Sequence, residues 1–313
     1  MSEQNLSSSG HKLGQIVGDW FEEQVAVPLL TSVANELGLY LDHRFQNRAC
    51  RGSKIIWPDL DGNNVDYDFV LELGGDDSTK GVPLAFFETF WRRGARHSKD
   101  KARDDSGKLL PMRDTYPTAR VLGIISAGDF TQPAQELVRS RAIDLFYIPK
   151  NKICQAWNDC KLPIDYLDSA SEAVKARIAE KTEKALTSQK KTRIQKQLLS
   201  IVGEAVLDSY VQRIVAGVAA VPIEFRITPV FIGEQVIFNK HTDAEMFLAQ
   251  QHAHAAYDAM KQMFGYQVLF SDGNIFNRDS LTSEQALGLH SSVGKVAIYF
   301  EQYHANKRLQ RKR

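Results

Sequence analysis

The chain has 313 residues, of which 43% are hydrophobic and 25% charged, with a formal net charge of +1 at pH 7. This composition is that of an ordinary globular protein, and it gives no sign of a generally basic nucleic-acid binder, although a locally basic cleft remains compatible with it. Three cysteines without a CxxC pair argue against a disulfide framework or a zinc site, and no apolar run approaches the ~20 residues that span a bilayer. The polar first residues lack the pattern of a signal peptide, so we expect a cytoplasmic protein without a membrane segment.

Residues 11–39 predict one long amphipathic helix, because apolar residues recur there at helical spacing. Pro28 predicts a kink or a break near it, and Gly38 is a plausible C-cap. Glu22 is either a plain solvated acid or part of a site. Gly18, four residues before it, would let a backbone or DNA come close.

A basic segment follows over residues 41–56, with little apolar content after Phe45. It predicts either a phosphate-facing loop or an ordinary solvated surface. Its bases are Arg44, Arg48, Arg51 and Lys54.

Two apolar runs, residues 65–73 and 83–92, predict neighbouring strands joined by a turn. Both runs carry acids, Asp66 and Asp68 on one face of the first and Glu88 in the second. Side chains alternate across a strand, so Glu88 shares its face with Phe86 and Phe90. An acid in such a run is costly unless a cation or a hydrogen bond compensates it. Two strand carboxylates with bases close behind them suggest a site for a hard divalent cation.

A dense basic cluster comes directly after the second run, and a helix is expected to begin near Lys99, with Ser98 as its cap. The cluster could neutralise DNA phosphates, or it could form an ion-paired exposed helix. Its members are Arg92, Arg93, Arg96, Lys99, Lys101, Arg103 and Lys108.

Further along, residues 120–126 and 143–149 predict strands, and residues 133–141 a short helix that begins with a proline. The first part of the chain, residues 1–150, is therefore expected to be an α/β core with a mixed central sheet flanked by helices.

These acids and bases resemble the core of the PD-(D/E)xK nuclease superfamily, to which most type II restriction endonucleases belong. The resemblance covers about the first half of the chain and implies a restriction-endonuclease-like core. It implies that Asp68 and Glu88 hold Mg²⁺, and that Glu22 from the first helix adds a further ligand. The literal Pro58-Asp59 pair is a decoy, since it leads into a turn-like Asp-Gly-Asn-Asn stretch rather than a strand.

One position departs from the family pattern. The lysine that follows the second acid by two residues is replaced by Phe90, which carries no charge. The resemblance makes Arg92, Lys99 and Lys101 the candidate replacements. Arg92 stays protonated and is a poor general base, but it could hold the scissile phosphate.

Residues 151–313 are expected to form a mainly helical α+β C-terminal region for DNA recognition or dimerisation. Between Glu172 and Lys196, eight bases oppose three acids, which predicts either a DNA-facing helical face or a plainly solvated one. Further helices are expected over residues 203–220, 243–264 and 280–289, and an antiparallel pair over 223–232 and 236–238. Residues 294–303 could be a strand or a helix. The expected DNA contacts of the whole chain are Arg93, Arg96, Arg103, Lys190, Lys191 and Arg193.

The resemblance implies a Mg²⁺-dependent endonuclease that cuts double-stranded DNA, most simply as a bacterial type II restriction enzyme. It also implies a homodimer, which matches two-fold DNA sites, and a possible DNA methyltransferase that acts on the same site. Clustered acids raise one another's pKa, so activity is expected to fall in mild acid. Phe90 keeps open the alternative of a non-catalytic DNA-binding protein with a degenerate nuclease core. An RNA-processing nuclease is a third possibility.

Overall fold

The computed structural model describes residues 9–254 and 263–311. Its core is a five-stranded mixed sheet with the strand order β1-β4-β5-β6-β7. The first three strands in this order pair antiparallel and the last three pair parallel. The strands are β1 (Tyr40–His43), β4 (Phe69–Leu73), β5 (Val82–Arg92), β6 (Val121–Gly128) and β7 (Asp144–Pro149). The expected mixed central sheet flanked by helices is confirmed.

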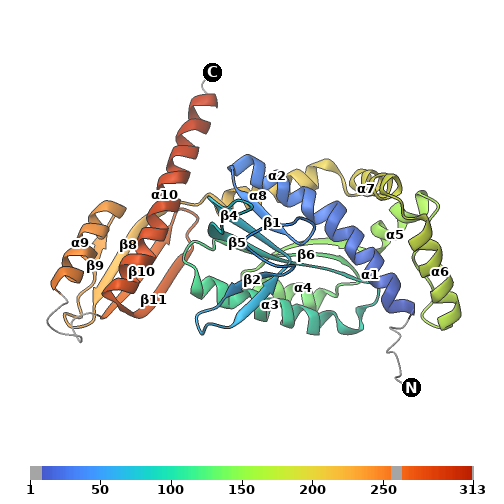
Figure 1. Ribbon diagram of the computed structural model, residues 1–313, viewed down its shortest axis with the longest axis horizontal. Helices are drawn as coiled ribbons and strands as arrows, with labels where there is room; N and C mark the ends of the chain where they lie inside the picture. The colour runs from blue at the N-terminus through green and yellow to red at the C-terminus, as the bar shows by residue number, and fades with distance from the viewer. Residues whose placement is uncertain (1–8, 255–262, 312–313) are drawn as a thin grey trace.

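Helices cover both faces of this sheet, which is why its central strand β5 is almost continuously apolar. Along β5, Phe87 packs toward one face, whereas Phe86 and Phe90 pack toward the other. Figure 1 shows α1, α2 and α8 on one side and α3 and α4 on the other. The helices of the first side are α1 (Ser9–Phe21), α2 (Val27–Leu37), α5 (Lys150–Asp159), α7 (Ser188–Val202) and α8 (Glu204–Val218), with α6 (Glu172–Ala185) packed against α1. Those of the second are α3 (Ser98–Thr115) and α4 (Gln132–Ser140).

The expected N-terminal helix is interrupted by a π-helical turn, Glu22–Ala26, between α1 and α2. Pro28 lies in the first turn of α2, where its missing N–H removes a regular helical hydrogen bond. The expected irregularity near Pro28 is confirmed, and so is the C-cap, because Gly38 ends α2 with a φ of 64°.

The run expected as one strand over residues 65–73 is two strands that separate at Asp68. Its first part, β3 (Asn64–Tyr67), pairs with β2 (Ile55–Pro58) in a separate two-stranded sheet. Its second part is β4 of the core sheet. The break leaves the carboxylate of Asp68 at the junction of the two sheets rather than in the middle of a strand.

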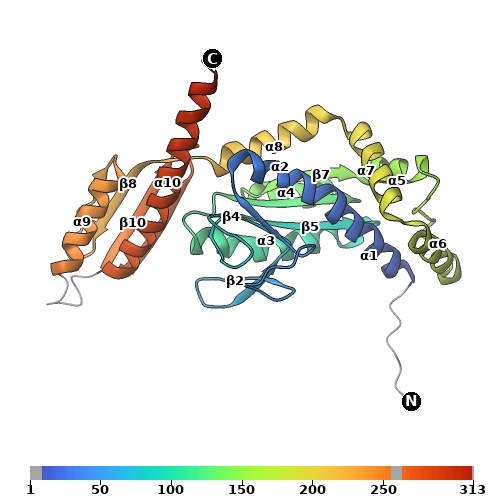
Figure 2. The same ribbon diagram turned by 45° about the horizontal axis from the view of Figure 1, so that its top comes forward.

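The division expected at residue 150 does not coincide with a boundary between hydrophobic clusters. Helices α5, α7 and α8 belong to the same cluster as α1 and the core sheet. A separate cluster begins at Ala220 and contains the C-terminal elements. Figure 2 shows these elements grouped beside the core.

This C-terminal module is a four-stranded antiparallel sheet, in the order β11-β10-β8-β9, with two helices. Its strands are β8 (Pro222–Pro229), β9 (Val236–Phe238), β10 (Met263–Phe270) and β11 (Ile275–Thr282), and its helices are α9 (His241–His254) and α10 (Ser283–Arg311). The expected pair β8–β9 is confirmed, and residues 294–303 are helical.

The expected helix over residues 243–264 is wrong at its end, because Met263 and Phe264 belong to β10, while residues 255–262 lie outside the described part. Alternate side chains of β10, from Phe264 to Phe270, are buried against the helices, and this sheet burial outweighs local helical preference. None of the described helices has the length and apolar character that crossing a membrane requires.

Candidate active site

Asp68 lies next to Glu88 in the register of the core sheet. The pairing of Phe69 with Phe87 brings the residue before Phe69 alongside the residue after Phe87. Oδ2 of Asp68 accepts hydrogen bonds from the backbone N of Thr89 at 2.7 Å and from its hydroxyl at 3.1 Å. These bonds anchor the Asp68 carboxylate on β5, the strand that carries Glu88.

Glu88 is 2% exposed, and its two carboxylate oxygens differ in their surroundings. Oε2 accepts a hydrogen bond from Nζ of Lys108 at 3.0 Å. Oε1 is buried and has no hydrogen-bond partner in the described part of the chain. Burial, together with the charges of Asp68 and Asp105, raises the pKa of Glu88 to about 8.

Helix α3 brings three ionisable side chains to this side of the sheet. Lys101, Asp105 and Lys108 lie on one helix face, because their spacings are four and three residues. Asp105 is fully buried, and its Oδ1 accepts a hydrogen bond from Nζ of Lys101 at 2.6 Å. Its Oδ2, like Oε1 of Glu88, lacks a partner among the described residues. Burial raises the pKa of Asp105 in spite of Lys101.

Lys108 is the cation that donates a hydrogen bond to the carboxylate of Glu88. Burial opposes its charge, but Glu88, Asp105 and Asp68 together outweigh that effect, so the pKa of Lys108 lies above its ordinary value. Its ammonium therefore stays charged beside the acids at neutral pH.

Glu22 approaches from the opposite side of the sheet, at the start of the π-helical turn. It is 7% exposed and accepts hydrogen bonds from Arg44 at 2.8 and 2.6 Å. Burial raises the pKa of Glu22 to about 7; the bond from Arg44 opposes this rise and the charge of Asp68 adds to it. The charge of Asp68 thus raises the pKa of both Glu22 and Glu88.

The expected replacements for the missing lysine occupy different places. Lys101 is bonded to Asp105, and its ammonium lies 5.5 Å from the centre of the Phe90 ring. Lys99 is exposed and has no hydrogen-bond or ion-pair partner among the described residues. Arg92 ends β5, four residues beyond Glu88, or about 13 Å along an extended strand. Phe90 itself packs edge-on against Phe130, with ring centres 5.1 Å apart.

Sequence reasoning counted Lys108 among the cluster bases but did not place it in the site. The available signal was its spacing of seven residues from Lys101, which puts both on one helix face. That spacing could not reveal which face of α3 packs on the sheet.

The expected DNA contacts fall into two groups. Arg93, Lys190 and Lys191 already make structural contacts: Arg93 with Asp165, Asp168 and the carbonyl of Tyr166, Lys190 with the carbonyl of Cys160, and Lys191 with Glu23. The others, Arg96, Arg103 and Arg193, are exposed, and Arg103 contacts Asp100 at 3.4 Å.

In the basic segment 41–56, Arg48 and Arg51 are neither phosphate-facing nor solvated. Arg48 is fully buried between Asp42 and Glu72, with N–O distances of 2.7 and 2.6 Å. Arg51 also binds Asp42, at 2.7 Å. Both interpretations offered by the sequence are wrong for these two residues, because acids from β1 and β4 neutralise them inside the protein. The decoy Asp59 lies in the β2–β3 turn and accepts bonds from Asn63.

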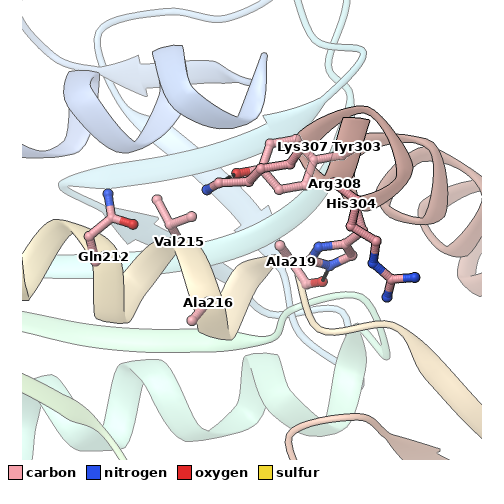
Figure 3. A pocket seen from close by; sticks show the side chains of 8 residues that line it. All are labelled: Gln212, Val215, Ala216, Ala219, Tyr303, His304, Lys307 and Arg308. Carbon is pink, nitrogen blue, oxygen red and sulfur yellow. Dashed lines mark hydrogen bonds between the residues drawn. The ribbon is translucent and has the colours of Figure 1, made fainter. Parts of the chain in front are cut away.

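A pocket of about 260 Å³ lies between α8 and α10, far along the chain from the acids. Figure 3 shows Gln212 and Val215 on one helix facing Tyr303 and Lys307 on the other. Lys307 is bonded to Glu36 at 2.7 Å, so its charge is already neutralised. This pocket lies where the C-terminal helix α10 packs beside α8 of the core, and no carboxylate of the described residues lines it.

No known family model, curated protein or solved structure matches this chain.

The residues of the acidic site fit a hard cation bound through oxygen. In the described part of the chain no three His, Cys, Asp or Glu side chains are arranged as a ready-made metal cage. Magnesium does not require one, because it keeps several waters and is usually bound by one or two carboxylates together with substrate phosphates. The two buried carboxylate oxygens without partners, Glu88 Oε1 and Asp105 Oδ2, are acceptors of the kind such a cation or its waters would satisfy.

Proposed function

We propose that this chain is a Mg²⁺-dependent endodeoxyribonuclease with a restriction-endonuclease-like core of the PD-(D/E)xK type. The observation that carries the proposal is the position of Glu88. Its carboxylate is almost fully buried beside Asp68, one of its oxygens has no partner in the described chain, and a lysine is bonded to the other. Burying such a group is costly, so its retention favours a functional role.

The sheet supports the same proposal. The antiparallel strands β1-β4-β5 and the parallel strands β6 and β7 together form a mixed central sheet, which the resemblance implies. The break before β4 and the central strand β5 bring the two acids together, and the first helical segment adds Glu22 from the other side.

Each side chain has a defined task in this proposal. Asp68 and Glu88 hold Mg²⁺, with Glu22 as a further carboxylate near Asp68. The bound cation would lower the pKa of a water molecule and offset charge on the leaving oxygen. Lys108 takes the place of the lysine missing at Phe90: its ammonium lies at Glu88 and can contact the attacked phosphate. Glu88, with a pKa of about 8, must release its proton to become a ligand.

The substrate in this proposal is double-stranded DNA, cut by a homodimer of the restriction type. A DNA methyltransferase that acts on the same site would be its natural counterpart.

Digestion of supercoiled plasmid in Mg²⁺ or Mn²⁺ tests the proposal. The wild-type chain should cut, whereas Asp68→Ala and Glu88→Gln should still bind DNA but reduce cutting to background. Asp59→Ala is the matched control, because this acid forms the literal Pro-Asp pair of the sequence yet lies in the β2–β3 turn, where it accepts hydrogen bonds from Asn63. Cutting by Glu88→Gln at the wild-type rate would overturn the assignment.

The second candidate is a non-catalytic DNA-binding protein with a degenerate core. It is favoured by the buried phenylalanine in the lysine position and by the ammonium of Lys108 occupying one oxygen of Glu88. Binding of the plasmid without cutting in either metal would favour this candidate.

A further inference from the structure

A cavity of about 340 Å³ lies beyond the C-terminal end of β5, outside the acidic site. One wall is formed by the first turns of α1, with His11 and Gly14, and the other by Trp91 and Arg92 at the end of β5. His97, just before α3, completes its rim. Its volume lies at the low end of the ~300–1,000 Å³ of small-molecule sites.

The lining of this cavity favours an anionic ligand. It contains no carboxylate, although several bases contribute to it. Arg92 is exposed, and no described residue forms a hydrogen bond or an ion pair with its side chain. Arg93 differs, since it is held by Asp168 and Asp165. Arg92 is therefore the cavity's available guanidinium for a phosphate.

The cavity also has an apolar wall and open space. Trp91 is half-buried, packs against the main hydrophobic core and lines the cavity. A methyl group added at Gly14 would meet no other atom within 4 Å, so a side chain there would enter free space. An aromatic ring beside an arginine is a common way to hold a sugar or base together with its phosphate.

The cavity lies at about the same distance from the acids along strand β5 as along helix α1. Along β5, Arg92 lies four residues beyond Glu88, or about 13 Å. Along α1, Gly14 lies eight residues before Glu22, or about 12 Å.

One face of helix α1 runs from the cavity to the acidic site. Gly14, Gly18 and Glu22 recur every four residues and so share that face. A Cβ on Gly18 would lie 3.9 Å from Cβ of Trp91, so α1 and the end of β5 are in close contact between the cavity and the acids.

We propose that this cavity binds a nucleotide of the substrate DNA strand away from the scissile phosphate, with its phosphate at Arg92 and its sugar against Trp91. The proposal rests on the nuclease function and deepens it by assigning a remote contact on the strand that is cut. Binding there positions the scissile phosphate, because contacts away from the reacting centre contribute to orientation at the acids.

The fluorescence of Trp91 provides a test that does not depend on cleavage. The other three tryptophans, Trp20, Trp57 and Trp157, are buried. A short double-stranded oligodeoxynucleotide, added in metal-free buffer, should change the fluorescence of the full-length chain and protect it from iodide quenching. Trp91→Phe should abolish that signal.

Two variants locate the binding. Gly14→Leu fills the open space and Arg92→Ala removes the guanidinium, and each should weaken oligonucleotide binding at least about tenfold, which corresponds to ~1.4 kcal/mol. Gly288→Leu is the matched control: Gly288 lies in α10, where an added side chain would also meet nothing within 4 Å, and its variant should bind like the wild type.

The outcomes separate this inference from the proposed function. Unchanged affinity in both Gly14→Leu and Arg92→Ala, in a chain that cuts plasmid, overturns the cavity assignment alone. If plasmid is not cut but oligonucleotide binding is lost in both variants, the cavity binds a nucleotide and the nuclease function is wrong. Equal competition by inorganic phosphate and the oligonucleotide at the same concentration would show a simple anion site and contradict the nucleotide assignment.

Discussion

The ammonium of Lys108 lies 3.0 Å from Oε2 of Glu88, although the two residues are twenty positions apart and belong to a helix and a strand. The position two residues after Glu88, where the resembled family has its lysine, is instead a phenylalanine packed on Phe130. A positive charge therefore reaches the carboxylate from α3 rather than from β5.

Replacement of Lys108 tests whether this charge serves the reaction. Lys108→Ala is predicted to lower the single-turnover rate of DNA cleavage by ~10²–10³-fold, the range for removal of one positioned donor that stabilises charge in the transition state. Lys99→Ala is the matched control, because Lys99 lies on the same helix but is exposed, and its rate should stay within a few fold of wild type. A Lys108→Ala enzyme as fast as the control would remove Lys108 from the site.

The pH dependence of metal binding follows from the raised pKa values. Glu88 has a pKa of about 8 and Glu22 of about 7, so both are mainly protonated at pH 6. A metal must displace these protons, so Mn²⁺ affinity is predicted to rise from pH 6 and level off above the pKa of Glu88. Calorimetry in buffers of different ionisation enthalpy should detect proton release at pH 7. Affinity that is independent of pH, without proton release, would contradict the assigned ligands.

Glu88 also makes a prediction about stability. Its pKa is about 8 when folded and near the ordinary value of 4.5 when unfolded, so between these values the folded chain retains a proton that the unfolded chain releases. Wild-type stability therefore decreases through this group as pH rises from about 4.5 to 8. Glu88→Gln cannot ionise, so thermal unfolding in metal-free buffer should show it gaining on the wild type across that window. If the stabilities of the two proteins changed in parallel with pH, burial would not raise the pKa of Glu88.

Replacement of Arg48 tests whether this arginine stabilises the fold through Asp42 and Glu72 instead of contacting a phosphate. Arg48→Met leaves Asp42 and Glu72 buried without their shared cation, and it is predicted to cost about 3–5 kcal/mol of unfolding free energy in urea titrations. The salt dependence of DNA binding should not change, because Arg48 meets no phosphate. Arg96→Met, at an exposed base, should change stability by no more than about 0.5 kcal/mol. A reduced salt slope in Arg48→Met would restore the phosphate-facing interpretation.

Asp68 and Glu88 were predictable because their signals are local, whereas Asp105 was not placed in the site. Glu88 interrupts an almost continuously apolar run, and the turn after β4 indicates that the two strands are neighbours. The mixed sheet also follows from the order of the apolar runs. The break at Asp68 does not, because it depends on β3 pairing with β2 instead of continuing into the core sheet.

The features that could not be predicted depend on contacts between distant segments. Whether Arg48 meets water or a carboxylate is decided by Glu72, twenty-four residues away on another strand. Lys108 enters the site only because of the direction in which α3 packs on the sheet. In β10, Met263 and Phe264 directly follow a stretch with helical spacing, so the start of the strand emerges only from pairing with β8 and β11.

The most direct test of the central claim is to locate a divalent cation in a crystal of the chain grown with Mn²⁺ above pH 8, using the anomalous scattering of manganese. We predict one strong anomalous peak within coordination distance of Asp68 and Glu88, and its loss in a Glu88→Gln crystal grown under the same conditions. Absence of a peak at these carboxylates in the wild type, or a peak there that persists unchanged in Glu88→Gln, would contradict the account.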